Sequence, residues 1–566
     1  MLPPLNLPVS VLGVLMAVRP CFTAPSFTTF CGLVAGLAGQ VCRTVPWPGC
    51  CWARACSGPG RMNRAHYFFS RARWQIDELG LAVARLVTET LVSPGADVTI
   101  ALDDPVRVRA GRKVRGTGWQ HDGSAKNRQK LSFGNCFVTV GIVVELPFCS
   151  RSWCLPVLAR LHLPGKGAGP SKVTVAAELV ALLAAALPGR RLSVVADAAY
   201  HGPALRALPA NVTWTCRLPK TAVLYGLAPP RTGRRGRPRT RGERLGTPAD
   251  LARNAAWTTH HVVTYHGRTD IRHIAAVRCL WYGSFHARAV TVVLVRDQDT
   301  ASGYDLALVT TDDTAAAGPA LIVSRYAMRW SVEQAFAGAR NVLGAGEARN
   351  RSRLAVERTV PFALPVHTLI VVWYARHGYD QADIDARRDD QPWYGEKTEP
   401  AFEDMLVKLR RVMIAARFSA PGPAQPTTDE IRRHLSLSRS SGLIPRTCES
   451  RDSCAAFTGR PTANSPQNAA ERAFSQASIW AVNSKRRRSS CAITQSCPEQ
   501  PAICRPASTS RRPHVGRGSL CRYGSASLCR WSTQHTFRPI LPWNFRLTDL
   551  RGRSRRFALR VPSWRT

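Results

Sequence analysis

The sequence predicts an α/β protein, and three observations support that fold class. Short runs rich in Val, Ile and Leu, typical of strands, alternate with longer Ala- and Leu-rich runs of helical period. Between residues 96 and 219 their order reads strand, strand, strand, helix, strand, with helices before this region and after it. The chain has 566 residues and is 45% hydrophobic, so it can bury a substantial core.

The N-terminal region, residues 1–95, is predicted to be helical. His66–Val92 carries a broad apolar face at helical spacing and is expected to form one helix. The apolar start of the chain is interrupted by prolines and lacks a basic leader, so we expect a cytoplasmic protein without membrane association. Residues 42–62 are crowded with Gly, Pro and Cys and have no period, so we interpret them as aberrant sequence.

Residues 96–219 are predicted to hold the first part of the core. Three strand-like runs are bounded by turns: 98–108, 136–148 and 153–163. A helix follows, which Ser171 begins as its N-cap and which ends at Pro188 and Gly189. The next strand leads to Asp197.

Three further regions complete the chain. Residues 220–313 read as a β-rich insertion that contains a basic loop, and residues 314–438 return to helices. Residues 439–566 are basic and rich in Ser, Arg and Cys without a sustained period, so this tail is expected to be disordered or translated out of frame. The ordered protein is expected to end soon after Leu435.

The charge balance points to nucleic acid as the partner. The formal net charge is +41 and the pI is about 10.9, and the body stays strongly basic when the tail is left out. A solvated basic surface without a ligand would have the same balance. None of the 18 cysteines form a CxxC pair, which argues against a structural zinc site.

Three carboxylates are candidates for the chemistry of phosphoryl transfer. Asp103 follows the apolar run VTIAL, Asp197 follows LSVVA, and Glu333 lies inside an amphipathic helical pattern. Two-metal catalysis needs such carboxylates to converge on divalent ions. Asp104 is the rival of Asp103, and an Asp after a strand can equally be an ordinary turn residue.

The segment around Glu333 carries a more specific pattern, Y-x2-R-x3-E-x6-R, formed by Tyr326, Arg329, Glu333 and Arg340. Helical spacing would bring these side chains to one face of a single helix. The pattern resembles the Y-R-E-K signature of bacterial insertion-sequence transposases with a DDE site, with Arg340 replacing the usual Lys. The resemblance extends through ALDDP and VVADAAYHG and covers roughly residues 22–435, apart from residues 42–62.

The resemblance implies an RNase H-like catalytic domain whose last catalytic helix follows a β-rich insertion. It implies that Asp103, Asp197 and Glu333 bind Mg²⁺ or Mn²⁺, the hard ions that all-oxygen sites favour. Tyr326, Arg329 and Arg340 resemble residues that contact the phosphates of the transposon end. Pro105 stands where the family often has Thr.

Two further features bear on DNA binding. The basic loop contains Arg235, Arg237 and Arg239 in an Arg-Gly-Arg-Pro-Arg run, which is similar to a minor-groove hook but would also suit a solvated loop. Trp281, beside Tyr282, could stack on a flipped base, as aromatic residues of this insertion do in related transposases, or pack in the core.

The sequence is therefore read as a DDE transposase. It would cleave double-stranded DNA at inverted-repeat ends and join the freed 3′ hydroxyl to target DNA, acting as a homodimer on the DNA. Two alternatives stay open: an RNase H-like nuclease without strand transfer, and a catalytically inactive DNA-binding remnant.

Overall fold

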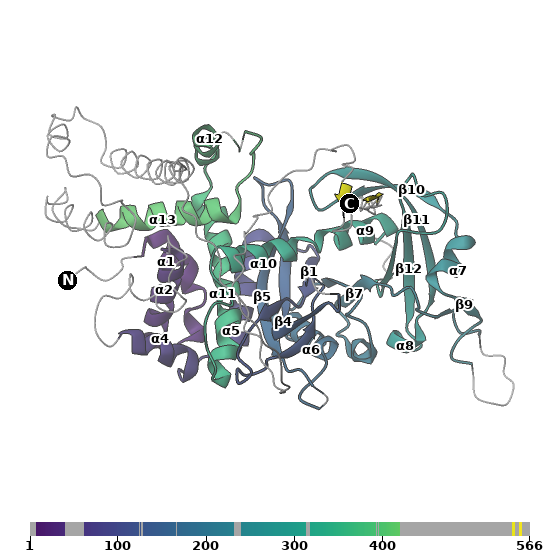
Figure 1. The fold of residues 1–566 in the computed structure, drawn as a ribbon, viewed down its shortest axis with the longest axis horizontal. Helices are drawn as coiled ribbons and strands as arrows, with labels where there is room; N and C mark the ends of the chain where they lie inside the picture. The colour runs from purple at the N-terminus through teal and green to yellow at the C-terminus, as the bar shows by residue number, and fades with distance from the viewer. Residues whose placement is uncertain are drawn as a thin grey trace, which may run out of the picture. The chain divides into compact units, whose positions relative to one another are not determined.

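The computed structural model describes residues 7–39, 61–123, 125, 128–165, 167–230, 239–312, 317–391, 393, 395–418, 546–548 and 554–556. The chain divides into two compact units, residues 1–492 and residues 493–566. The second unit contains two short antiparallel strands, β14 (Arg546–Thr548) and β15 (Ser554–Arg556). All other described elements belong to the first unit (Figure 1).

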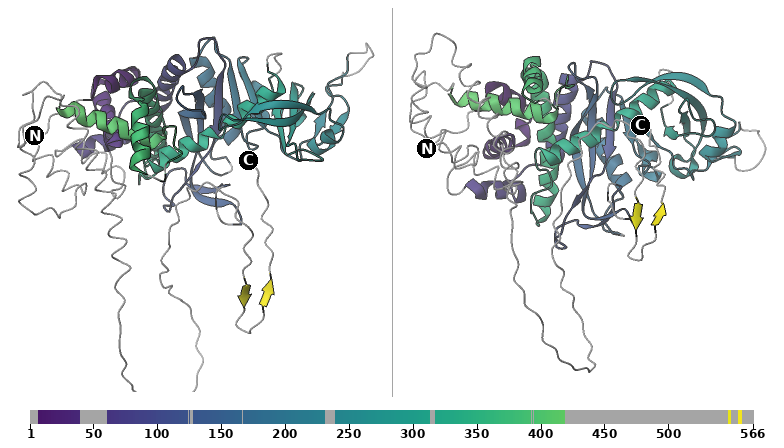
Figure 2. Two further views of the ribbon diagram at one scale, coloured as in Figure 1. Left: turned by 90° about the horizontal axis from the view of Figure 1, so that it is seen from above. Right: turned by 45° about the horizontal axis from the view of Figure 1, so that its top comes forward.

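A mixed sheet forms the centre of the first unit. Its first strands are β1 (Val98–Asp103), β2 (Val106–Val108), β3 (Gly118–His121), β4 (Leu131–Glu145), β5 (Ser152–His162), β6 (Leu192–Ala196) and β7 (Val212–Arg217). β4 pairs antiparallel with β1, β2, β3 and β5, whereas β1, β6 and β7 run parallel. Figure 2 shows these strands side by side with helices against them. The predicted mixed α/β architecture is confirmed, and it is compatible with an RNase H-like domain.

The long strand β4 lacks the alternation of polar and apolar residues that is typical of a strand with one exposed face. Residues 134–144 are buried without interruption, because neighbouring elements cover both faces of the sheet at this point. Gly141 is required here, since a Cβ atom would collide with the Cys154 sulfur of β5. The register between the two strands shifts at Val140 and Gly141, as expected at a β-bulge.

The interval 220–313 contributes most of the remaining strands. They are β8 (Leu224–Tyr225), β9 (Arg244–Gly246), β10 (Thr258–Val263), β11 (Thr269–Leu280), β12 (Ala289–Arg296) and β13 (Leu306–Thr310), with the short helices α7 (Pro248–Arg253) and α8 (Tyr282–Phe285). β13 pairs with β7, so these strands continue the same sheet. Arg235 and Arg237 lie outside the described residues, and Arg239 is exposed.

The N-terminal helices differ from the prediction. The expected single helix His66–Val92 is wrong, because two helices occupy this region, α4 (Arg61–Ser70) and α5 (Ile76–Leu91). Trp74 turns inward between them and its indole Nε1 donates to the Phe68 carbonyl at 2.7 Å. Two more helices precede them, α1 (Val9–Met16) and α2 (Ala24–Ala38).

The break between α4 and α5 is stabilised by a distant side chain. The Arg358 guanidinium donates at 2.7–3.4 Å to four backbone carbonyls, those of Phe68 and Phe69 in the last turn of α4 and those of Ala72 and Trp74 in the segment that follows. A helix end leaves carbonyls without intrahelical partners, and Arg358 supplies the missing donors. Local periodicity gives no sign of this contact, since it joins segments that are far apart in the chain.

Arg358 belongs to α11 (Arg353–Trp373), which a π-helical turn, η3 (Tyr374–Gly378), continues. Arg353–Gly378 is long and apolar enough to cross a membrane, but 94% of its most apolar window is buried inside the protein, which is typical of a core helix. The remaining helices are α6 (Lys172–Ala186), α9 (Pro319–Met328), α10 (Ser331–Asn341), α12 (Gln381–Asp390) and α13 (Phe402–Phe418). Of the predicted tail, residues 439–566, only β14 and β15 lie within the described residues.

Candidate active site

Two of the predicted carboxylates stand at the ends of neighbouring parallel strands. Asp103 ends β1, and Asp197 comes directly after β6. The two strands are in parallel register, with Leu102 opposite Ala196, so the next residue of each strand lies at the same edge of the sheet. The structure therefore brings Asp103 and Asp197 together.

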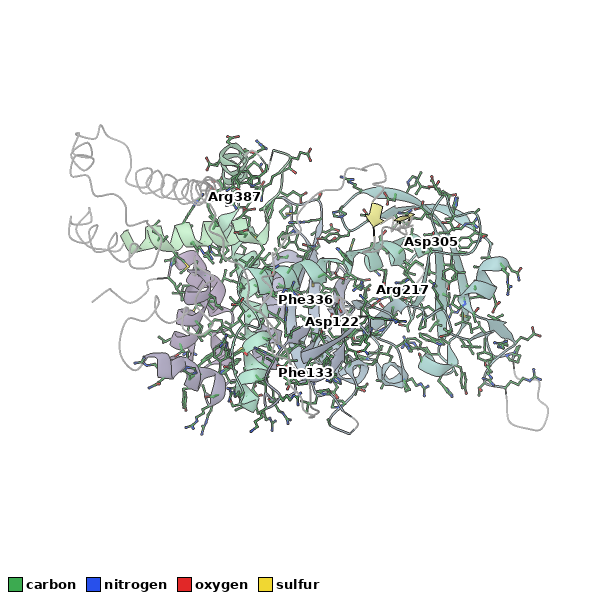
Figure 3. The ribbon with its side chains drawn as sticks, viewed as in Figure 1. Asp122, Phe133, Arg217, Asp305, Phe336 and Arg387 are labelled. Carbon is green, nitrogen blue, oxygen red and sulfur yellow. The ribbon has the colours of Figure 1, made fainter. Side chains whose placement is uncertain are left out.

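The pleat of β1 separates Asp103 from Asp104. Successive side chains of a strand point to opposite faces. Ala101 and Val195 pack in one buried cluster with residues of α10, including Phe336, labelled in Figure 3. Asp103 and Asp197 each lie two residues further along, so both belong to the face that α10 covers, and Asp104 belongs to the other.

The carboxylate of Asp104 is occupied on that other face. Lys172 Nζ lies 2.5 Å from Asp104 Oδ2, and Tyr200 Oη donates to Asp104 Oδ1 at 2.6 Å. The Cys136 thiol adds a third contact at 3.2 Å. Burial, followed by the charge of Asp104, raises the pKa of Tyr200, which keeps the phenol protonated as a donor. This geometry favours Asp103 over its rival as a metal ligand.

The helix that carries the Y-R-E-R signature is interrupted. The sequence predicts one helix over residues 320–344, but α9 ends at Met328 and α10 begins at Ser331. Between them the Arg329 amide donates to the Tyr326 carbonyl and the Glu333 amide donates to the Trp330 carbonyl, both at 3.1 Å. These are the i to i+3 bonds of a tighter 3₁₀-type turn. The expectation of one uninterrupted helix is therefore wrong, although Tyr326 and Glu333 still lie beside Arg329.

Glu333 lies in the first turn of α10, close to the two aspartates. Burial raises the pKa of Glu333, Arg329 lowers it, and the charges of Asp103 and Asp197 raise it further. Burial likewise raises the pKa of Asp103, with a smaller contribution from Asp197. The charges of both strand-end aspartates therefore reach Glu333, which places the three carboxylates near one another.

Arg329 stands among these carboxylates. Its Nη1 lies 3.5 Å from Asp103 Oδ2, and its side chain is only 13% exposed. Burial lowers the pKa of Arg329, but Tyr326 and the three carboxylates together outweigh it, so the net shift is upward. The Arg329 Nε atom is buried without a hydrogen-bond partner. The guanidinium therefore balances part of the negative charge while keeping a free donor.

The donor set is suited to a hard divalent cation, since it consists of carboxylate oxygens alone. Burial, with a smaller contribution from the charge of Asp197, raises the pKa of both Asp103 and Glu333, and a cation bound beside them would favour their ionised forms. In the part of the chain that the structure describes, however, no three His, Cys, Asp or Glu side chains are close enough to hold an ion as they stand. To hold a cation together, these carboxylates would have to draw closer.

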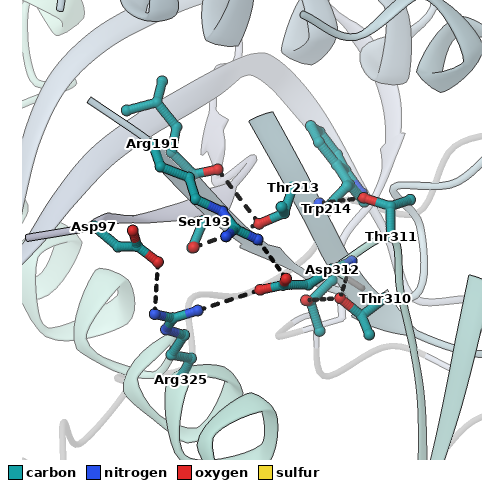
Figure 4. Close-up of polar contacts among 11 residues, drawn as sticks. Asp97, Arg191, Ser193, Thr213, Trp214, Thr310, Thr311, Asp312 and Arg325 are labelled. Carbon is teal, nitrogen blue, oxygen red and sulfur yellow. Dashed lines mark hydrogen bonds and ion pairs between the residues drawn. The ribbon is translucent and has the colours of Figure 1, made fainter. Parts of the chain in front are cut away.

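An ion-pair network fixes α9 on the sheet, as Figure 4 shows. Arg325 of α9 donates to Asp97 at 2.8 Å and reaches Asp312 at 3.4 Å, and Arg191 also pairs with Asp312. Asp312 is 5% exposed, and both guanidinium groups pair with its buried carboxylate. The network holds α9 just before Tyr326 and Arg329, and nothing in the sequence pattern indicated it.

The other predicted DNA-binding residues lie in different surroundings. Tyr326 is partly buried, and its ring lies 5.7 Å from the Arg329 guanidinium. Arg340 is exposed on the last turn of α10. Trp281 is 6% exposed and packs against His201 and Phe285, an arrangement that favours the packing alternative over base stacking.

Sequence reasoning missed two groups of side chains near this site. Lys172 and Tyr200, which hold Asp104, come from the start of α6 and the loop after β6. Arg107 and Arg109 belong to the edge of the sheet at β2. The Val-Arg-Val run of β2 is typical of an edge strand with an outward Arg, so the sequence offered no reason to single it out.

Comparison with known proteins identifies a related family. Residues 50–288 match the family model described as DDE superfamily endonuclease. The match includes Asp103 and Asp197 and stops short of Glu333. A search among proteins of curated function finds none that matches.

Proposed function

We propose that this protein is an insertion-sequence transposase, since residues 50–288 match the family model of the DDE superfamily endonucleases. It cleaves DNA at inverted-repeat ends and transfers the 3′-hydroxyl strand to target DNA. The observation that carries the proposal is the convergence of two strand-end aspartates with Glu333 of α10 on one face of the sheet.

The strand order supports an RNase H-like core for this reaction. In the sequence β5-β4-β1-β6-β7, the first three strands are antiparallel and the last two join β1 in parallel. Such a sheet delivers Asp103 and Asp197 from two adjacent strand ends. Helix α10, which enters after the β-rich interval, supplies the third carboxylate.

Asp103, Asp197 and Glu333 would hold Mg²⁺ or Mn²⁺. The bound ions would polarise the scissile phosphate and lower the pKa of the attacking water or 3′ hydroxyl. The protein must keep the three carboxylates ionised, although burial raises the pKa of Asp103 and Glu333. Arg329 favours the ionised state by its positive charge.

Arg329 and Arg340 would bind phosphate oxygens of the DNA. The Arg329 guanidinium already has an unused donor, Nε, and a planar fork that suits two phosphate oxygens. Arg340 lies seven residues after Glu333, so it would contact the backbone beyond the scissile position. Cations that neutralise phosphates give binding that weakens steeply with salt.

The proposal includes the assembly and its location. Two protomers pair on the DNA ends, the N-terminal helices contribute to end recognition, and the loop with Arg235, Arg237 and Arg239 contacts the DNA backbone or minor groove. The enzyme works in the cytoplasm, where the nucleoid lies.

A joining assay tests the proposal. Labelled duplexes with the terminal sequences of the DNA segment that encodes the chain are incubated with Mg²⁺ and a supercoiled target. Covalently joined donor and target products are expected, and Asp197→Asn should abolish both cleavage and joining while keeping DNA binding in EDTA. Asp270→Asn, a change to a half-exposed carboxylate on β11, is the matched control and should behave as wild type.

Each alternative has its own outcome in this assay. Cleavage without joined product would indicate a nuclease that lacks strand transfer. DNA binding without cleavage, with Mg²⁺ and with Mn²⁺, would indicate an inactive DNA-binding remnant.

A further inference from the structure

Arg107, in the edge strand β2, is a buried cation without an anion. It is 5% exposed, and its Nε and Nη2 atoms have no hydrogen-bond partner. Burial, followed by the charges of the neighbouring cations Arg340 and Arg109, lowers the pKa of Arg107 to about 10. Removing a guanidinium from water without pairing it is unfavourable. The free protein therefore carries a destabilising feature at this position.

Strand register puts Arg107 on the same sheet face as the catalytic carboxylates. Arg107 of β2 lies opposite Asn135 of β4, and Asp103 of β1 lies opposite Thr139 of the same strand. Residues 135 and 139 are separated by an even number of positions, so they point to the same face of β4. Arg107 and Asp103 accordingly share the face that α10 covers.

Two more guanidinium groups gather around Arg107. Arg109 lies two residues after Arg107 and on the same side of the chain. Its Nη1 donates to the Ala348 carbonyl at 2.7 Å, and its Nε has no hydrogen-bond partner. Arg340 approaches from the end of α10. In the described part of the chain, no carboxylate forms an ion pair with any of these three residues.

The loop after α10 closes over the stem of Arg107. Gly346 has φ +94°, and a Cβ atom there would lie 3.2 Å from Arg107 Cδ. Glycine allows both this backbone conformation and the close approach. Together with the Arg109 bond to Ala348, the loop holds two guanidinium groups in place before any ligand arrives.

We propose that Arg107 and Arg109, together with Arg340, bind a backbone phosphate of DNA beside the active site. The inference rests on the proposed function, because that function supplies the polyanion. Three converging guanidinium groups without a carboxylate match the charge and the bidentate geometry of a phosphate. Glu333 and Arg340 are seven residues apart, about 10 Å along a helix, so the bound phosphate lies within about three nucleotides of the scissile one.

DNA binding without catalysis tests this site. Affinity for a labelled duplex of about 40 base pairs, long enough to span the site, is measured in EDTA over a range of KCl concentrations. Wild type is compared with Arg107→Met and Arg109→Gln, and each variant is expected to bind about tenfold more weakly. The slope of log affinity against log salt should become shallower by about 0.9 for each phosphate that the variant no longer neutralises.

Arg388→Gln is the matched control. It also removes one positive charge, but Arg388 lies on α12 and pairs with Asp385. The affinity and the salt slope of Arg388→Gln are expected to stay within about twofold of wild type. Arg388 is already paired with a carboxylate of its own helix, so it neutralises no DNA phosphate and its loss changes counterion release little.

Thermal unfolding separates a binding role from a structural one. Without DNA, Arg107→Met should raise the melting temperature, because it replaces an unpaired buried cation by an apolar side chain of similar volume. A lower melting temperature would mean that Arg107 supports the fold. Wild-type affinity and slope in both Arg107→Met and Arg109→Gln would overturn the site and leave the proposed transposase intact, whereas a wild-type protein that fails to bind DNA would overturn both.

Discussion

Replacing Asp104 by Asn should destabilise the protein, whereas replacing its neighbour Asp103 by Asn should not. The side chain of Asp104 is 14% exposed, and its carboxylate takes Lys172 and Tyr200 as close partners. Asn keeps one acceptor oxygen but loses the charge, so the partly buried Lys172 ammonium is left without its counter-ion. Asp103 has one long ion pair, to Arg329, and two carboxylate neighbours.

The magnitude follows from the burial of the pair. Breaking a fully buried ion pair costs about 3–5 kcal/mol. Lys172 keeps a quarter of its side chain in contact with solvent, and Asn can still accept one hydrogen bond, so we expect a loss of about 2 kcal/mol. For a folded unit of about 400 residues, that loss corresponds to a fall in melting temperature of roughly 2–3 °C.

Two measurements on the same variants separate the roles of the adjacent residues. Urea unfolding in EDTA gives stability, and single-turnover cleavage with Mn²⁺ well below the unfolding temperature gives activity. Asp104→Asn should lose stability and retain cleavage within about tenfold of wild type. Asp103→Asn should keep its unfolding midpoint and lose cleavage by at least about a thousandfold, because a metal ligand is removed.

The reverse pattern would refute the assignment. If Asp104→Asn unfolded like wild type and failed to cleave, Asp104 would be the metal ligand and its contacts with Lys172 and Tyr200 would be incidental. Tyr200→Phe provides an independent check, since it removes one donor to Asp104 without changing any charge. It should cost about 1 kcal/mol and leave the metal dependence of cleavage unchanged.

Three further predictions concern the elements around the site. Asp312→Asn should lower stability by about 2 kcal/mol, since it breaks the pairs with Arg191 and Arg325, and an unchanged urea midpoint would contradict the network. Arg358→Met should lower the free energy of unfolding by about 2 kcal/mol, because it removes the donor that four carbonyls share. Amide hydrogen exchange should speed up relative to wild type, and more so in α4 than in the other helices. Since burial raises the pKa of Glu333, its contribution to stability in EDTA is complete at low pH and is lost as pH rises through that raised pKa. The melting temperature of wild type should therefore fall relative to Glu333→Gln above about pH 4, and parallel pH profiles would count against the raised pKa.

The positions of the two strand-end aspartates could be predicted from the sequence, because an apolar run and the residue that follows it are local features. VTIAL and LSVVA predict buried strands, and Asp103 and Asp197 follow them. Strand periodicity alone does not decide between Asp103 and Asp104. It shows that the two side chains point to opposite faces of the sheet, but not which of these faces α10 covers. That information comes only from the cluster of Ala101, Val195 and Phe336, whose members are distant in the chain.

The break between α9 and α10 shows where local reasoning ends and what tertiary contacts add to the site. Arg329 and Trp330 have helical dihedral angles, and neither Pro nor Gly interrupts the pattern, so nothing local marks the break. The interruption coincides with two contacts from other parts of the protein: the Arg325 network holds α9 on the sheet, and Arg329 reaches Asp103. On either side of this turn, Arg329 and Glu333 both lie near the strand-end aspartates, so one segment supplies a cation and a carboxylate to the same site.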